Sequence, residues 1–372
     1  MSEGQPIEVG LVLQGGGALG AYQWGAITAL LDLMDEAENR GDAVVLKVVT
    51  GVSIGAVNAA CVVGSRDWTD ARERLRKLWE YLRLDAFPLL PPPVQRDLAL
   101  FGLPGFYVPR TDYWNLLCWT YLYDTAPLLK TLNEHVDFAA INRSETALVL
   151  TAVDVASGEL IRFRNRGAQR TKDPTAGPVK DEVVVLGPAH VLASGSLAPQ
   201  FPWVRIGKAC YWDGGLVDNT PLGDAIDAFS SDPDVKRLLV VMNLYPLRAR
   251  LPKSLAEVQD RVHELMYGSR LRQDRKSAER VNRLVATVDE LAKLIPEQSL
   301  SDKLRHEIEQ ARQFKLVTVV DVDMQDPSDG QPARQNPLDD HEGLRDFSPR
   351  TVEYRRAAGY IIATKRLTPY LS

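Results

Sequence analysis

Ser53 is the residue of this sequence best suited to act as a nucleophile. It stands in Gly51-Val52-Ser53-Ile54-Gly55, a Gly-x-Ser-x-Gly pattern. Between a strand and a helix, this pattern makes a sharp turn that lifts the serine hydroxyl out of the sheet. A serine hydroxyl is nearly inert at neutral pH, so catalysis also needs a nearby base and N–H groups directed at the developing oxyanion. On its own, the pattern is equally typical of a tight packing turn.

A glycine-rich stretch near the amino terminus offers such N–H groups. The sequence from Gly15 to Gly20 reads GGGALG and lies between an apolar run and a helical pattern. Successive backbone N–H groups in such a loop converge on negative charge, and the helix dipole behind them adds to the effect. The sequence therefore predicts an oxyanion hole formed by Gly15, Gly16, Gly17 and Ala18.

The same glycines allow a second interpretation, a dinucleotide-binding loop. Gly15, Gly17 and Gly20 have the G-x-G-x-x-G spacing of that loop. A nicotinamide-binding protein also carries an acidic residue near the end of its second strand, where it binds the ribose. Here the second predicted strand ends in Thr50 and the serine turn. We therefore disfavour the dinucleotide site and expect no cofactor.

Asp213 is the candidate general base. It begins the turn Asp213-Gly214-Gly215, whose glycines let the backbone approach a neighbour closely. Asp-Gly-Gly alone is more often only a turn. Its surroundings are more informative: the segment from Ala193 to Pro202 precedes it, and Asn219 to Pro221 follows, with a threonine suited to cap a helix that begins at the proline.

A histidine base is the alternative to a lone carboxylate. The α/β-hydrolases use the same serine turn and place first an acid and then a histidine after it in the chain. The sequence contains five histidines, which are His135, His190, His263, His306 and His341. The first two precede Asp213, and the others lie in predicted helices or a polar segment, where a surface or packing role is simpler. We therefore favour a Ser53–Asp213 pair without histidine.

Each of the two glycine turns stands between a predicted strand and a predicted helix. Ile7 to Leu13 is an apolar run before the first turn, and apolar residues recur at helical spacing after it. Val44 to Val49 is a β-branched run before the second turn, which is followed by small residues through Ala60. Two such units imply a parallel sheet with both turns at its carboxyl edge, where open α/β folds bind ligands.

The rest of the chain continues this α/β pattern to about residue 245 and then becomes mostly helical. We expect a catalytic domain over residues 7–245, with an aromatic cap inserted at about 85–130, and a carboxyl-terminal extension over 246–372. The expected elements are a helix at Asp70 to Leu84, paired strands at Leu148 to Val153 and Leu160 to Arg164, a hairpin at Trp203 to Tyr211, a core strand at Arg237 to Leu244, a helix at Ser254 to Ile295, a strand at Leu316 to Val322 and a closing helix at Thr351 to Leu367.

Composition limits the partners and the compartment. The net charge of −5 gives no general attraction to nucleic acid, which we do not expect as a partner. Three cysteines without metal-ligand spacing argue against a disulfide framework and a metal site. The polar stretch Met1 to Glu8 lacks the order of a secretory signal, and no apolar run reaches the roughly 18 to 20 residues of a membrane span. We expect a cytoplasmic protein whose contact with a membrane is peripheral.

Taken in order, the glycine loop, the serine turn, the segment Ala193 to Pro202 and the Asp-Gly-Gly turn resemble the patatin-like phospholipase family over residues 7–228. Four linked motifs are far more specific than any one of them. The resemblance implies a three-layer α/β/α fold with a mainly parallel sheet. By the same resemblance, five further glycines belong to the glycine loop, the serine turn and the Asp-Gly-Gly turn of the family: Gly20, Gly51, Gly55, Gly214 and Gly215.

The resemblance also implies residue roles. Ser53 would be the nucleophile, Asp213 the general base, and the amides around Gly16, Gly17 and Ala18 the oxyanion donors. One position departs from the family: many members have arginine or lysine where Leu19 stands. A cation there would favour a phosphate headgroup.

The expected function is a lipid acyl hydrolase of the phospholipase A or esterase type, acting on esters or thioesters. The pKa of an ordinary aspartate is about 3.9, so its site must be dry enough to raise that value. The alternatives on the same scaffold are an acyltransferase and a non-catalytic lipid-binding protein. Trp and Tyr side chains in the aromatic cap are suited to contact acyl chains or a membrane interface, and plain core packing is an equally good interpretation of them.

Overall fold

The computed structural model describes residues 5–84, 98–167, 179–232, 234–245, 251–252, 255–295, 301–312, 316–324 and 344–372. The first part of the expected cap, residues 85–97, lies outside these ranges. So does His341.

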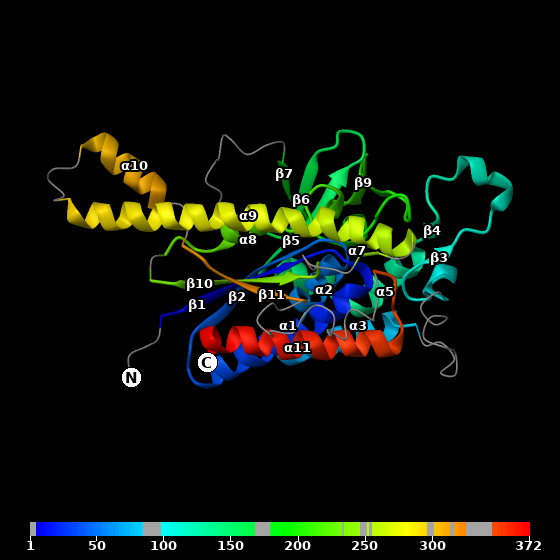
Figure 1. Ribbon diagram of the computed structural model, residues 1–372, viewed down its shortest axis with the longest axis horizontal. Helices are drawn as coiled ribbons and strands as arrows, with labels where there is room; N and C mark the ends of the chain where they lie inside the picture. The colour runs from blue at the N-terminus through cyan, green and yellow to red at the C-terminus, as the bar shows by residue number, and fades with distance from the viewer. Residues whose placement is uncertain are drawn as a thin grey trace.

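A mainly parallel sheet forms the centre of the molecule (Figure 1). Its strand order is β11-β10-β1-β2-β5-β6-β7, and the first five of these strands are parallel to their neighbours. The hairpin β8–β9 pairs with β5 in the antiparallel sense, as does β6. The strands are β1 Ile7–Leu13, β2 Val44–Gly51, β5 Ala147–Asp154, β6 Leu160–Arg164, β7 Val179–Val183, β8 Val204–Ile206, β9 Ala209–Asp213, β10 Lys236–Asn243 and β11 Thr318–Asp323.

Helices cover both faces of the sheet. On one face lie α1 Gly20–Asn39, α2 Ile54–Val63, α3 Trp68–Leu82 and α11 Pro349–Leu371, and on the other lie α8 Leu222–Ala228 and the long α9 Leu255–Leu294 (Figure 1). The remaining helices are α5 Ala126–His135, α6 Phe138–Arg143, α7 Pro188–Ser194, α10 Asp302–Arg312 and the short turns η1 Gly17–Leu19, η2 Leu98–Phe101, η3 Tyr113–Cys118 and η4 Gly214–Leu216. The central strands are buried on both faces, as is typical of parallel sheets. The predicted three-layer α/β/α fold is confirmed.

The local predictions from hydrophobic periodicity are confirmed for the strands and the long helices. Two details differ. The segment before Asp213 contains helix α7, which was not predicted because its end is rich in serine and glycine. Helix α8 begins at Leu222 and not at Pro221, because Pro221 has a ψ of 66°, outside the helical region.

The carboxyl-terminal extension is built into the same layers. Strand β11 adds to the sheet parallel to β10, and helix α11 packs along α1. The two helices meet at glycines: a Cβ on Gly25 would lie 1.8 Å from the Arg356 carbonyl oxygen, and one on Gly359 would lie 2.0 Å from the Tyr22 carbonyl oxygen. The domain boundary near residue 245 stays a prediction, since residues on both sides of it share one sheet.

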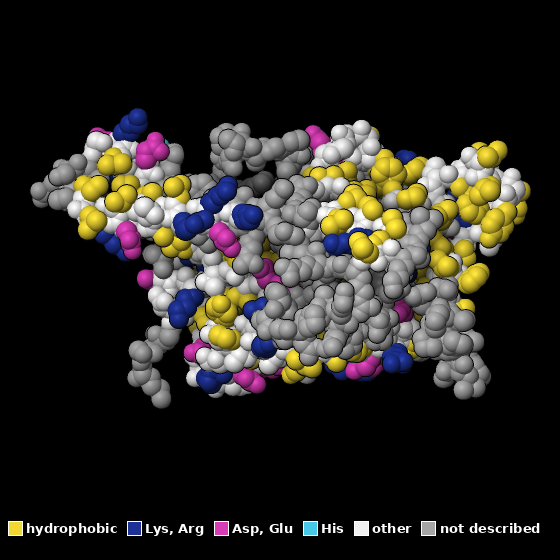
Figure 2. Space-filling model, viewed as in Figure 1, with side chains coloured by type: hydrophobic (Ala, Val, Ile, Leu, Met, Phe, Trp, Pro, Cys, Tyr) yellow, Lys and Arg dark blue, Asp and Glu magenta, His cyan; other side chains and the backbone are white. Residues whose placement is uncertain are grey.

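The described part of the expected aromatic cap, from residue 98 onward, forms a lobe at one end of the sheet (Figure 1, cyan). We call it the aromatic lobe. Strands β3 Val108–Pro109 and β4 Tyr123–Asp124 pair at its base, and η3 lies between them. The Arg110 guanidinium lies over the rings of Trp119 and Tyr121, at 4.8 and 4.5 Å from their centroids. Figure 2 shows apolar side chains gathered on this lobe.

Gly359→Val is expected to lower the free energy of unfolding by about 3 kcal/mol, because any side chain there must push α11 away from α1. Urea denaturation measures this. The control is Gly223→Ala on α8, where a Cβ meets nothing within 4 Å. That change should be neutral or slightly stabilising. Equal stability of Gly359→Val and the wild type would show that the two helices do not need this close contact.

Candidate active site

Ser53 occupies a strained turn between β2 and α2. Its φ of 56° and ψ of −125° are unusual for a residue with a side chain, and such strain tends to persist where the surrounding structure enforces it. Gly55 allows the turn to pack closely on β1, because a Cβ there would lie 2.3 Å from the Leu13 carbonyl oxygen. The turn therefore holds α2 against β1 and leaves the Ser53 side chain at the carboxyl edge of the sheet.

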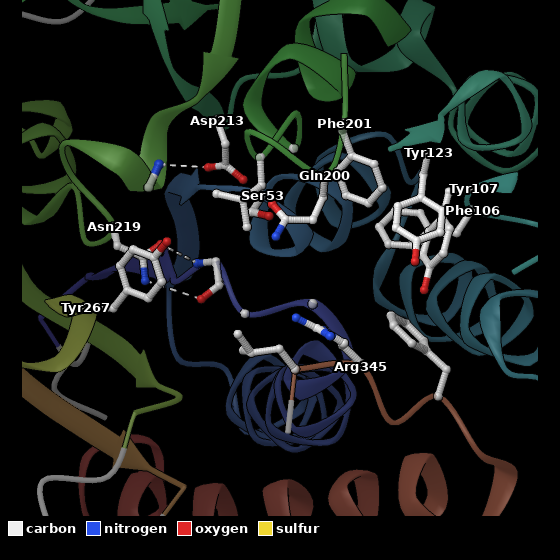
Figure 3. A pocket seen from close by; sticks show the side chains of 18 of the residues that line it. Ser53, Phe106, Tyr107, Tyr123, Gln200, Phe201, Asp213, Asn219, Tyr267 and Arg345 are labelled. Carbon is white, nitrogen blue, oxygen red and sulfur yellow. Dashed lines mark hydrogen bonds between the residues drawn. The ribbon is translucent and has the colours of Figure 1, made fainter. Parts of the chain in front are cut away.

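The segment Ser194 to Ser196 links Ser53 to Asp213. The Ser53 N–H donates to the Ser194 carbonyl oxygen at 3.0 Å, and the Asp213 N–H donates to the Ser196 carbonyl oxygen at 3.0 Å. Behind Asp213, Gly214 packs on β5 so closely that a Cβ would lie 2.4 Å from the Thr151 carbonyl oxygen. One short segment thus fixes both backbones, and the side chains of Ser53 and Asp213 turn toward each other (Figure 3).

The Asp213 carboxyl is almost completely removed from water. The residue is 2% exposed, and burial raises its pKa from 3.8 to about 7. The hydrogen bond from the Gly215 N–H, at 2.7 Å, and the nearby Ser53 hydroxyl lower the pKa but do not cancel the effect of burial. The carboxyl group can therefore take up and release a proton near neutral pH.

The glycine loop lies beside Ser53, and its four N–H groups differ. Gly15, Gly16 and Gly17 line the same pocket as Ser53, whereas Ala18 is fully buried. The Gly15 N–H donates to Asn219 Oδ1 at 3.0 Å (Figure 3), and the Ala18 N–H donates to the Leu344 carbonyl oxygen at 2.8 Å. The N–H groups of Gly16 and Gly17 donate to no residue in the described ranges.

Further contacts hold Gly15 and the residue before it. The Tyr245 hydroxyl donates to the Gly15 carbonyl oxygen at 2.6 Å. Gln14 donates through Nε2 to the Thr220 hydroxyl at 2.7 Å, and its Oε1 accepts from the Leu244 N–H at 2.9 Å. The loop is thus tied to β10 and to the start of α8, which makes its N–H groups preorganised donors.

A buried chain of hydrogen bonds continues beneath the loop. Gln23 donates to the Gln14 carbonyl oxygen at 2.8 Å, Asn58 donates to Gln23 at 3.0 Å, and Trp79 donates to Asn58 at 2.9 Å. Since all four side chains are fully buried, each bond satisfies a group that would otherwise be costly to bury. The chain connects α1, α2 and α3 under the site.

Ser53 and Asp213 line a pocket of about 180 Å³. Four aromatic rings form one arm of it, with centroid separations between 4.9 and 6.4 Å; they belong to Phe106, Tyr107, Tyr123 and Phe201. Its polar lining includes Gln200, Asn219 and Arg345. The Leu19 side chain is buried in the core and is not part of this lining.

Several lining residues were missed by sequence reasoning. Asn219 stood in a noted motif but was read only as part of a helix start. Tyr245, Tyr267 and Arg345 come from the end of β10, from α9 and from the segment before α11, and no local pattern marked them. Only their positions in the folded chain bring them to the site.

The histidines in the described ranges lie elsewhere. His190 packs edge-on against Phe163, and His135 packs at a tilt against Tyr81. Neither of these nor His306 lines the pocket; the side chain of His263 is outside the described part of the chain. Within the described residues, no cluster of His, Cys, Asp and Glu is arranged to bind a metal ion.

A family model described as patatin-like phospholipase matches residues 11–226. The chain belongs to the patatin-like phospholipase family. A second model, described as patatin phospholipase, matches residues 265–369, so most of the carboxyl-terminal extension also has counterparts among patatin-like sequences. No curated protein resembles the chain closely enough in sequence to count as a relative.

Several solved structures resemble the chain at low sequence identity. VipD from Legionella pneumophila is 14% identical, with a TM-score of 0.36, over 98% of this chain and 67% of that one. Human GIVD cytosolic phospholipase A2 is 13% identical, with a TM-score of 0.44, over 99% and 59%. The type III effector protein ExoU of Pseudomonas aeruginosa is 13% identical, with a TM-score of 0.31, over 98% and 53%. The chain spans about half to two thirds of the length of these proteins.

Asp213→Asn is expected to stabilise this patatin-like chain at pH 8 but not at pH 4. Below about pH 4, both folded and unfolded chains hold the proton. As the pH rises from about 4 to 7, the unfolded chain loses the proton while the folded chain keeps it, so the free energy of unfolding falls, and above 7 the loss is complete. Asparagine is neutral throughout and avoids this loss, which is on the order of a few kcal/mol.

Thermal unfolding of both proteins at pH 4, 6 and 8 measures this difference. The control is Asp302→Asn, an exposed carboxylate on α10, which should change the melting temperature little at any of these pH values. A gap between Asp213→Asn and the wild type that does not depend on pH would contradict the raised pKa.

Proposed function

We propose that this chain is a lipid acyl hydrolase that cleaves carboxylic esters through a Ser53–Asp213 dyad. Membership of the patatin-like phospholipase family supports the hydrolysis of lipid esters. The observation that carries the finer proposal is the buried Asp213 carboxyl, with a pKa near 7, turned toward a serine in a strained turn. A dry carboxylate is a stronger base than an ordinary aspartate.

In the first half of the reaction, the Asp213 carboxylate takes the Ser53 proton as Oγ attacks the ester carbonyl carbon. The tetrahedral intermediate collapses, the bond to the alkoxide breaks, and the alkoxide leaves with the proton from Asp213. In the second half, Asp213 takes a proton from water, the hydroxide attacks the acyl-enzyme, and the proton returns to Ser53 as the free acid departs.

The N–H groups of Gly16 and Gly17 are the proposed oxyanion donors. Gly15 and Ala18 were predicted alongside them, but in this structure their N–H groups donate to Asn219 and Leu344. The other two border the Ser53 pocket and make no hydrogen bond with a described residue. The short helix η1 and helix α1 begin at this loop, so their dipoles add positive potential there.

The acyl chain would lie against the aromatic arm of the pocket. Phe106, Tyr107 and Phe201 form its wall, and Leu100 and Leu122 extend the apolar surface toward the lobe. Such a wall offers an acyl chain apolar contact and gives a peptide few hydrogen bonds. An alkoxide leaves more readily than an amine, which must be protonated first, so a site with a single acid–base group is better suited to esters than to amides.

Ser53→Ala is expected to lower the hydrolysis of p-nitrophenyl hexanoate by at least about 10³-fold, because no acyl-enzyme can form. The control is Ser65→Ala, whose hydroxyl donates to the Cys61 carbonyl oxygen at 2.7 Å in the turn after α2. It should keep wild-type turnover. Hydrolysis by Ser53→Ala at the wild-type rate would contradict the proposed nucleophile, and binding without turnover by the wild type would favour the non-catalytic alternative.

The aromatic lobe is the proposed membrane contact. Trp114 and Leu117 of η3 are 88% and 101% exposed, and they are flanked by exposed Tyr113 and Leu116. The base of the same lobe contributes Leu122 and Tyr123 to the pocket, so a membrane contacted by the tip lies close to the entrance. Among the described helices, none combines the length and the apolar character needed to cross a bilayer. The contact is therefore proposed to be peripheral.

Leu117→Asp is expected to weaken binding to phosphatidylcholine vesicles by about 10-fold, because a charge must leave water when the tip enters the interface. Vesicle flotation measures the bound fraction, and hydrolysis of a short soluble ester should stay unchanged. The control is Val185→Asp, an exposed apolar residue just after β7. Equal loss of binding in both variants, or in neither, would contradict a specific role of the lobe.

A further inference from the structure

Arg345 is the cation in the described lining of the Ser53 pocket. It lies in the short segment Leu344 to Ser348 that leads into α11, and Figure 3 shows its guanidinium directed into the pocket, toward the side of Gln200 and Ser53. Its charge also reaches the aromatic arm. Burial and Tyr123 raise the pKa of the Tyr107 hydroxyl, and the positive charge of Arg345 partly offsets that rise. A positive potential is thus placed a short way from the proposed nucleophile.

The backbone on both sides of Arg345 is anchored. The Leu344 carbonyl oxygen accepts from the Ala18 N–H at 2.8 Å, and the Phe347 carbonyl oxygen accepts from the Leu84 N–H at 2.9 Å. The Phe347 ring packs against Trp79 and Phe106, with centroids 6.3 and 5.8 Å away. The position of Arg345 relative to the glycine loop is therefore set by the fold.

The neighbouring acid does not neutralise Arg345. The Asp346 carboxylate accepts from the Ser348 N–H at 3.0 Å and from the Thr351 hydroxyl at 2.7 Å, and so serves the first turn of α11. Within the described part of the chain, the Arg345 guanidinium has no ion pair or hydrogen bond. The fold holds its backbone in place and leaves its donors available.

Gln200 adds a second unused group to the pocket lining. Its backbone is fixed, because its carbonyl oxygen accepts from the N–H groups of Leu122 and Tyr123. Its side-chain Oε1 is buried and has no hydrogen-bond partner in the described chain. A buried acceptor of this kind is costly unless a ligand donates to it. The described pocket lining thus combines the aromatic arm with an unused acceptor and an unpaired cation.

We propose that Arg345 is a specificity-determining residue that selects esters carrying a phosphate group close to the scissile bond. This inference rests on the proposed hydrolase function. The planar guanidinium binds two phosphate oxygens at once, while the acyl chain lies along the aromatic arm and the glycerol hydroxyl donates to Gln200. A glycerolipid has this layout, since its phosphate and ester oxygens are attached to the same glycerol.

The test compares two soluble substrates that differ only in the phosphate: 1-hexanoylglycerol and 1-hexanoylglycerol 3-phosphate. Arg345→Gln should lower kcat/KM for the phosphate ester by about 10- to 100-fold and leave the neutral ester within about 2-fold. Arg345→Lys should keep part of the preference, because a point charge replaces the planar pair of donors. The control, Arg350→Gln, removes an exposed charge from the first turn of α11 and should change neither substrate.

A binding measurement separates this inference from the proposed function. In Ser53→Ala protein, calorimetry should show that the phosphate ester binds at least about 10-fold tighter than the neutral ester, and that Arg345→Gln removes the difference. Equal effects of Arg345→Gln on both esters, or none on either, overturn the inference while leaving ester hydrolysis intact. Inorganic phosphate that binds as tightly as the phosphate ester also overturns it, because the site would then bind free phosphate. Hydrolysis that persists in Ser53→Ala overturns the proposed nucleophile alone.

Discussion

The removal of the Asp213 carboxyl from water is the constraint on which the site depends. Burial raises its pKa to about 7, so the group destabilises the fold at neutral pH in exchange for basicity. The backbone that carries this carboxyl is held by the Ser196 carbonyl oxygen and by the close approach of Gly214 to β5. The strained φ of Ser53 belongs to the same arrangement, since its N–H is held by the Ser194 carbonyl oxygen of the same segment. The strained Ser53 backbone and the desolvated Asp213 carboxyl thus lie together at the proposed catalytic site.

The carboxyl-terminal extension is part of this site and not an addition at its margin. Tyr267 of α9 and the segment before α11 line the pocket, and the Leu344 carbonyl oxygen binds the glycine loop itself. That segment is in turn positioned by α11, which can lie against α1 only because both helices have glycine where they meet. The packing of α11 on α1 thus helps to determine where the pocket receives its positive charge.

The sequence predicted the sheet and the two proposed reacting groups for physical reasons. Strands β1 and β2 are runs of buried apolar residues, and each is followed by a glycine-rich tight turn. The right-handed crossover between parallel strands places both turns at one edge of the sheet. Asp213 could be identified from its glycines and from the order of the motifs. Arg345, Tyr245 and Tyr267 could not, because they have ordinary neighbours in sequence and reach the pocket only through tertiary packing. Helix α7 was missed because its end is rich in serine and glycine, which usually mark loops.

The proposed role of Asp213 as the base for Ser53 underlies the whole mechanism. It is tested most directly by the rate at which a fluorophosphonate modifies Ser53 as a function of pH, with the modified residue identified by mass spectrometry. If Asp213 is the base, the rate rises with pH through a single apparent pKa near 7, and Asp213→Asn is modified at least about 10²-fold more slowly at pH 8. Modification of Asp213→Asn at the wild-type rate would show that Asp213 is not the base.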